Sequence, residues 1–327
     1  MATMTETPET IANEKRSHQF HAEAHVLSGE LQRPIEQKIE HHAPVALKDE
    51  RGGHLTRLAE DVSIEGLISF KTGHTRVSGS KSLKHHGWVT LSTSILEGLN
   101  VFEVITADRL VAQVATEHPY VNGHVPHVTF LGTKFENLQV GGFPVKLTLN
   151  FGVCGKKPEG DRPYLENSKF LSGIREQIAT VAAAEFLPEK VREQYDERLI
   201  EIDKLINRNR DQKANDERVK VTCSLVKSID IEDIPIPGLK TVGNVLVIPD
   251  FGAVSLAEVE VGIEPARTPS EFRRHEFEAR GSSNEANNGN PKMSNYFTLR
   301  MLNMELGCVG QGSVVAGNVV ANGQTRP

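Results

Sequence analysis

The chain has 327 residues, a formal net charge of −6 at pH 7 and a sequence pI near 6.1. This length can bury a large core without disulfides or metals, and the acidic balance gives no general attraction to phosphate backbones. Aromatic residues make up only 6% of the chain, so there is little material for stacking on bases. These totals argue against nucleic acid as the main partner.

Cysteine usage and the absence of targeting segments indicate a cytoplasmic protein. Cys154, Cys223 and Cys308 are odd in number and far apart, which argues against a disulfide framework and against a cysteine-type zinc site. The first residues lack the apolar core of a signal peptide, and no stretch of eighteen apolar residues occurs. We therefore expect a reducing compartment and no membrane span.

Residues 1–17 are polar and without periodicity, which predicts a disordered tail. Residues 18–163 form a β region, because short β-branched runs alternate there with turn residues. In WVTLSTSIL the more apolar set, from Val89 to Ile95, is expected to face the core. The segments expected to be strands are VSIEGLISFKTG, GWVTLSTSILEG, NVFEVIT, RLVAQVAT, HVTFLG and FPVKLTLNFG.

The pattern changes to helical within residues 164–213. Apolar residues recur at helical spacing in FLSGIREQIATVAAAEF and again in PEKVREQYDERLIEIDKLINRNR. Pro188 stands where the first helix must end and the second can begin. We expect a helical hairpin that packs its apolar stripe on the sheet, with a partner-binding helix pair as the alternative.

Residues 214–327 return to strand patterning and are expected to complete the same domain. RVKVTCSL alternates cleanly and places Cys223 on the buried face, and a hairpin is expected around Pro249 to Gly252. TPSEF predicts a short helix, and residues 281–292 a mobile loop. The predicted fold is mainly β, an antiparallel sandwich or open barrel with an inserted α-helical hairpin.

The stretch from Ser17 to Glu30, SHQFHAEAHVLSGE, contains three histidines and two glutamates. As a strand it places His21, Glu23 and His25 on one face and the intervening apolar residues on the other. As a helix it would bring His21 and His25 to chelating spacing. The continuing alternation favours the strand, in which these two histidines lie about 13 Å apart.

Twelve of the thirteen histidines precede Phe130, so a divalent metal site is considered. Its candidate ligands are His21, Glu23 and His25, with His124 or His127 from a later loop. Three such ligands and an open position would suit a hydrolytic or redox centre. Solvent-exposed histidines beside turns are the simpler interpretation.

A second candidate site is the stretch TGHTRVSGSKSLKHHGW. It has the appearance of a long exposed hairpin that could bind an anion, a glycan or an acidic partner. A charged hairpin that only keeps a sheet edge soluble is the alternative. The residues that would form the site are Arg76, Lys81, Lys84, His85, His86 and Trp88.

No nucleophile motif such as G-x-S-x-G occurs, and no catalytic residue is assigned. The first functional hypothesis is a non-enzymatic β-rich binding or self-assembly protein, either a homo-oligomer or the partner of another protein. Its expected contacts are the C-terminal Val/Gly/Asn segment and a proline-marked edge. The alternatives are a metal-dependent enzyme that uses the N-terminal histidines and a small-molecule binder with an apolar sheet interior.

Overall fold

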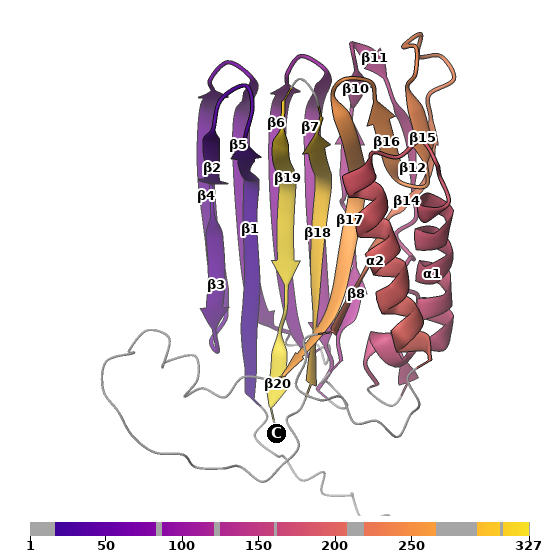
Figure 1. Ribbon diagram of the computed structural model, residues 1–327. Helices are drawn as coiled ribbons and strands as arrows, with labels where there is room; N and C mark the ends of the chain where they lie inside the picture. Colours follow the sequence, from indigo (N-terminus) through magenta and orange to yellow (C-terminus); the bar gives the residue numbers. More distant parts are fainter. Residues whose placement is uncertain are drawn as a thin grey trace, which may run out of the picture.

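The computed structural model describes residues 17–82, 87–120, 125–159, 162–207, 219–265, 293–307 and 310–326. Long antiparallel strands form two sheets that lie face to face, and a pair of helices packs at one end of this sandwich (Figure 1). Within the described residues neither sheet closes into a barrel. The prediction of an antiparallel β fold with a helical hairpin inserted mid-chain is confirmed.

One sheet has ten strands, in the order β15-β16-β17-β18-β19-β1-β2, with β3 and β20 paired to β1 and β13 paired to β17. Its strands are β1 (Ser17–Leu31), β2 (Gln37–His42), β3 (Val45–Asp49), β13 (Val219–Ser224), β15 (Lys240–Val242), β16 (Val245–Ile248), β17 (Gly252–Pro265), β18 (Met293–Leu306), β19 (Gly312–Ala321) and β20 (Gln324–Arg326). The first and last strands of the described chain therefore belong to one sheet.

The other sheet has eight strands, in the order β11-β10-β7-β6-β5-β4, with β8 and β9 paired to β7. Its strands are β4 (Gly53–Ile64), β5 (Ile68–Lys81), β6 (Trp88–Val101), β7 (Ile105–His118), β8 (His127–Thr129), β9 (Lys134–Glu136), β10 (Gln139–Val140) and β11 (Phe143–Pro144). A separate two-stranded sheet pairs β12 (Lys146–Leu149) with β14 (Val226–Asp230).

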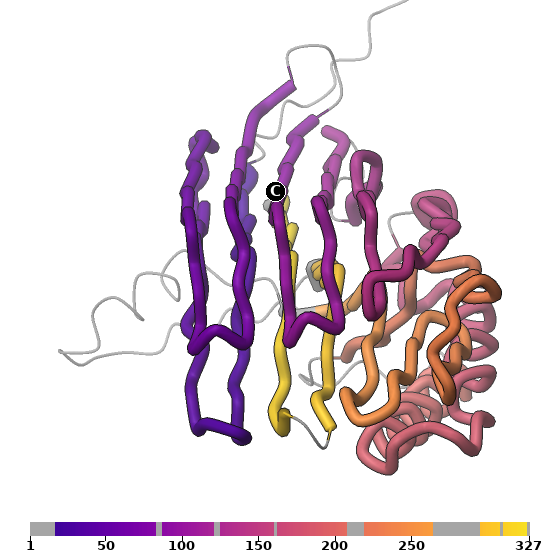
Figure 2. Tube along the Cα trace, turned by 90° about the horizontal axis from the view of Figure 1, so that it is seen from above, coloured from indigo at the N-terminus to yellow at the C-terminus, as the bar shows by residue number. Residues whose placement is uncertain are grey.

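The helical hairpin consists of α1 (Ser168–Ala182) and α2 (Glu189–Ile206), preceded by a short 3-10 turn, η2 (Tyr164–Glu166). The Asn167 side chain accepts hydrogen bonds from the first backbone amides of α1, and Pro188 immediately precedes α2, as its spacing predicted. Both helices pack against β13 at one end of the sandwich (Figure 2). No helix in the described ranges is both long and apolar enough to cross a membrane.

The C-terminal segment is not an exposed contact. Residues 312–321 form β19, which pairs with β18 on one side and with β1 on the other. Val314, Ala316 and Val319 are fully buried there. The expectation that this segment mediates assembly is therefore wrong, because its edges are already used to join the two halves of the ten-stranded sheet.

The buried face of β6 is the opposite of the one predicted. Ser92 and Ser94 are fully buried and point into the sandwich. Of the predicted apolar set, Val89, Leu91 and Ile95 are only half-buried, and Thr93 is 9% exposed. The Ser92 hydroxyl donates to the backbone carbonyl of Glu23 over 2.6 Å, and Ser94 donates to that of His25 over 3.0 Å. Small hydroxyl side chains let the sheets approach closely and satisfy carbonyls of β1.

The segment NVFEVIT is not a strand but contains the turn between β6 and β7. Phe102 and Glu103 have φ angles of 53° and 57°, and the amide of Val104 donates to the carbonyl of Val101. Two successive left-handed residues are typical of a tight hairpin turn, which usually contains Gly or Asn. The β-branched and aromatic composition hid this turn from the sequence pattern.

In the middle of each sheet, alternate strands contain one left-handed residue: Asp61 and Gly98 in the eight-stranded sheet, and Ala257 and Gly317 in the other. At each left-handed residue the alternation of inward and outward side chains shifts by one position. On β6 this shift occurs at Gly98, so Leu96 and Leu99 are both buried. On β4 the residues up to Ala59 therefore follow one alternation, and those after Asp61 follow the other.

Candidate functional site

The predicted histidine face exists. Residues 17–31 are a strand, so the helical alternative is wrong, and His21, Glu23 and His25 share its outer face. The Nε2 atom of His21 lies 2.9 Å from Oε1 of Glu23, and Nζ of Lys48 lies 2.7 Å from the same oxygen. Glu23 thus already contacts two neighbours on adjacent positions of the sheet, the Lys48 ammonium group and the His21 ring.

These partners hold the Glu23 carboxylate ionised. The hydrogen bond from His21, opposed by partial burial and reinforced by Lys48, lowers the pKa of Glu23 to about 2. His25 lies further along the strand, where its ring stacks on that of His41 at 4.1 Å. Burial, followed by the electrostatic effects of His41 and Arg300, lowers the pKa of His25 to about 4. The face therefore contains two separate pairs of residues.

The remaining predicted metal ligands do not join this face. His127 is exposed on β8, in the eight-stranded sheet, whereas β1 belongs to the ten-stranded one. His124 lies outside the described residues. Within the described ranges, no three His, Cys, Asp or Glu side chains are grouped so that they could hold a metal ion.

The predicted anion-binding cluster is spread along a hairpin. Arg76 is exposed in the middle of β5, while Lys81 lies opposite Trp88 where β5 and β6 approach their connection. The Lys81 ammonium group stands 6.0 Å from the Trp88 ring centroid and 5.4 Å from that of Tyr120. Lys84, His85 and His86 lie outside the described residues. Arg76 and Lys81 are thus not brought together.

Sequence reasoning missed a buried histidine beside this hairpin. His18 is 2% exposed, and its ring stacks on Trp88 at 5.2 Å and lies 4.7 Å from that of His118. Its Nδ1 atom is 3.0 Å from the hydroxyl of Thr325 on β20. Burial lowers the pKa of His18 to about 3. This cluster joins both sheets to the C-terminal strand.

Acid should weaken the fold at His18. Because the folded pKa lies below the ordinary value, the unfolded chain takes up a proton that the folded chain does not, and stability is lost as pH falls below about 6.5. The wild-type chain should lose stability between about pH 7 and about pH 4.5. In the His18→Asn variant this loss of unfolding free energy should be smaller by up to roughly 2.5 kcal/mol. Denaturant titrations at both pH values measure it.

The exposed His127→Asn variant is the matched control for this measurement, since His127 lies on the surface of β8. It should keep the pH dependence of the wild-type chain. Equal pH dependence in His18→Asn and in the wild type would show that His18 does not contribute to acid sensitivity.

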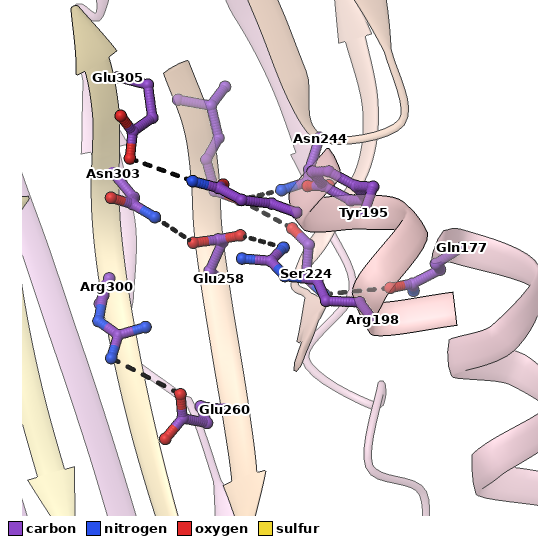
Figure 3. Close-up of polar contacts among 12 residues, drawn as sticks. Gln177, Tyr195, Arg198, Ser224, Asn244, Glu258, Glu260, Arg300, Asn303 and Glu305 are labelled. Carbon is purple, nitrogen blue, oxygen red and sulfur yellow. Dashed lines mark hydrogen bonds and ion pairs between the residues drawn. The ribbon is translucent and has the colours of Figure 1, made fainter. Parts of the chain in front are cut away.

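The most developed polar cluster lies where the helical hairpin meets the sheet (Figure 3). Glu258 of β17 is 1% exposed; Arg198 of α2 donates to its Oε1 over 2.8 Å, and Asn303 of β18 donates to its Oε2 over 2.7 Å. Burial alone would raise the pKa of Glu258, but Arg198 and Asn303 outweigh it, so this pKa lies below its ordinary value. The carboxylate is therefore buried and ionised, and it accepts one hydrogen bond at each oxygen.

Neighbouring residues complete this helix–sheet cluster. The Arg198 guanidinium lies 4.7 Å from the ring centroid of Tyr195, whose hydroxyl is 3.3 Å from Oδ1 of Asn244. On α1, Oε1 of Gln177 accepts a hydrogen bond from the backbone amide of Ser224 at 3.0 Å. A cavity of about 10 Å³ remains among these side chains, enough for about one water molecule.

The groups of the helix–sheet cluster suit stable ion pairs better than proton transfer. Burial raises the pKa of the Cys223 thiol, and likewise that of the Tyr195 phenol, to about 12, so both stay protonated at neutral pH. Nearby, Glu260 lies 3.2 Å from Nζ of Lys220 and 3.7 Å from Nη2 of Arg300. The cluster therefore fixes the helices on the sheet.

The sequence contained one signal for this cluster. In AVSLAEVEVG, Glu258 and Glu260 interrupt an otherwise apolar strand, and buried carboxylates require partners. Those partners come from α2, β13 and β18, which are distant in sequence, so their identity could not be deduced.

A family described as a domain of unknown function (DUF8256) matches residues 18–262. The chain belongs to this family. The match begins in β1, includes the helical hairpin and Glu258, and ends inside β17, so β18 and β19 lie beyond it although they stand between β17 and β1 in the sheet. No curated protein and no solved structure matches the chain.

Proposed function

We propose that this member of the family is a non-enzymatic binding or self-assembly protein that contacts other chains through the edge strand β4. The observation that supports this is the exposure of β4: all twelve of its residues are exposed or half-buried. Leu55 and Leu58 are 43% and 56% exposed on it. A long edge strand offers a row of backbone amides and carbonyls to a further strand.

Other edges offer less pairing surface. In the eight-stranded sheet the opposite edge is β11, which has two residues and includes Pro144. In the ten-stranded sheet β15 has three residues, and the charged β2 has six, with Lys38 and Glu40 forming an ion pair. Short strands, proline and charge are common protections of a sheet edge. This contrast favours β4.

The edge β4 lies on the opposite side of the sandwich from the helical hairpin (Figure 1). The proline-marked segment before β15 was the edge expected from the sequence, and β4 replaces it in this proposal. Both Cys154 and Cys223 are buried and free, which supports the further proposal of a reducing, cytoplasmic location.

The two alternatives have weaker support. A metal-dependent enzyme would need ligands that converge, and His21 and His127 lie on different sheets. A small-molecule binder would need space between the sheets, where the hydroxyls of Ser92 and Ser94 instead bond directly to carbonyls of β1.

Adding charge to the edge tests the proposal. The double variant Leu55→Lys with Leu58→Lys should lose self-association or bound partner proteins, because lysines on an edge strand disfavour pairing and neither leucine is buried. Native mass spectrometry of the purified full chain reports assembly, and a comparison of co-purifying proteins reports other partners.

The matched control is Leu131→Lys, which alters a leucine that is 66% exposed between β8 and β9. This variant should behave as the wild type. If the double variant keeps the same mass distribution and the same co-purifying proteins as the wild type, β4 is not the contact and the proposal fails.

A further inference from the structure

Charge is unevenly distributed along β4. His54 and Arg57 lie in its first half, and Glu60 and Asp61 lie in its second half. Within the described part of the chain Arg57, Glu60 and Asp61 form no ion pair. We call the first half, with Arg57 and the His54 ring, the basic half of β4, and the second half, with two carboxylates, the acidic half.

We propose that the strand received by β4 is β4 of a second copy, paired antiparallel about a two-fold axis near Leu58; this inference rests on the proposed function. Antiparallel pairing places the basic half of each copy against the acidic half of the other. Parallel pairing in register would instead place Arg57 beside Arg57 and Glu60 beside Glu60, which is destabilising.

Side-chain directions limit where the two-fold axis can lie. Leu55, Arg57 and Ala59 lie opposite Val77, Thr75 and Gly73 of β5, all of which are buried, so these β4 residues point to the inner side. Leu58 points to the outer side. Directly opposite residues must share a side, so an axis at a residue, and not between two residues, keeps both sheets continuous.

Leu58 is the residue that fits this centre best. It lies in the middle of the strand and is 56% exposed, so two copies would bury a leucine pair on the outer face. An axis at the neighbouring inner-side position, Arg57, would bring two guanidinium groups together. With the axis at Leu58, Arg57 lies opposite Ala59 of the second copy. On the outer side Glu60 lies opposite Thr56 of the second copy and diagonal to its His54.

An inward-pointing charge on an edge strand ordinarily discourages pairing. In the antiparallel pair centred at Leu58, Arg57 meets the small side chain of Ala59 instead of its own copy, and Glu60 lies near His54 of the second copy. The charged residues therefore favour the antiparallel arrangement over the parallel one, and Arg57 discourages other strands. Since each copy has one β4 and the opposite edge of the sheet is the two-residue β11, the assembly closes as a dimer.

Cysteine cross-linking tests this geometry. In the proposed dimer a cysteine at position 58 faces itself, at the Cα separation that a disulfide requires. Leu58→Cys should therefore form disulfide-linked dimers under mild oxidation. His54→Cys is equally a single change on β4, but its two copies would be about 27 Å apart, so it should cross-link at least about tenfold less.

The wild-type chain measures background oxidation, and sedimentation of the uncross-linked wild type measures the dimer itself. A wild-type monomer at every soluble concentration, or equal cross-linking at positions 54 and 58, overturns the two-fold dimer. The proposed function is decided separately, since the double lysine variant can still lose another partner in either case. If the double lysine variant loses neither self-association nor any partner protein, both the proposed function and the two-fold dimer are wrong.

Discussion

A chain that ends at residue 309 is expected not to fold. The truncation removes β19, whose two edges pair with β18 and β1, and leaves the backbone groups of both neighbours unpaired inside the sheet. It also removes Val314, Ala316 and Val319 from the core. Circular dichroism and thermal unfolding of the purified fragment should show loss of β structure and no cooperative transition.

A chain that ends at Gly323 is the control. It lacks β20, and with it the Thr325 hydroxyl that lies 3.0 Å from Nδ1 of His18, so it should keep the two sheets and unfold at a lower temperature than the wild type. Cooperative unfolding of the shorter fragment, ending at 309, would show that β19 is dispensable and would restore the C-terminal segment as a candidate contact.

Replacing Arg198 by Ala should lower the free energy of unfolding by roughly 3–5 kcal/mol, because it leaves the buried Glu258 carboxylate without its cation. Denaturant unfolding at neutral pH measures this. Arg175→Ala removes an exposed ion pair with Asp203 in the same helical hairpin and should lower the free energy of unfolding far less, because solvent screens an exposed pair. Equal losses in the two variants would contradict a special role for Glu258.

The pH dependence of the Arg198→Ala variant gives a second check. In the wild type the pKa of Glu258 is lowered, so its contribution is present above the unfolded pKa and is lost as pH falls. Without Arg198, burial dominates and should raise this pKa. The variant should therefore lose less unfolding free energy relative to the wild type in acid than at neutral pH. A double variant, Arg198→Met with Glu258→Gln, should recover much of the neutral-pH loss, since no buried charge remains unpaired.

Local patterns were sufficient where one element determines its own structure. The apolar spacing and Pro188 predicted α1 and α2, and the alternation around His21 predicted both the strand β1 and its polar face. The hairpin around Pro249 to Gly252 is also present, between β16 and β17. Propensity and periodicity act over a few residues, so the sequence contains this information directly.

Local patterns failed where composition and context disagree. The turn at Phe102 and Glu103 has left-handed residues without glycine, and β6 buries Ser92 and Ser94. In both cases the neighbouring strand decides: a hairpin connection forces the turn, and the carbonyls of β1 accept the serine hydroxyls. Tertiary contacts thus override intrinsic preference.

The sequence by itself determined the fold class, the helical hairpin and the polar face of β1. Only the tertiary structure decided that β19 is central, that β4 is the long exposed edge, and that Arg198 meets Glu258. Strand order and buried ion pairs join residues far apart in the chain, sixty positions in the case of this pair. Such contacts depend on which edges remain unpaired after the whole sheet has formed, and no local pattern records that.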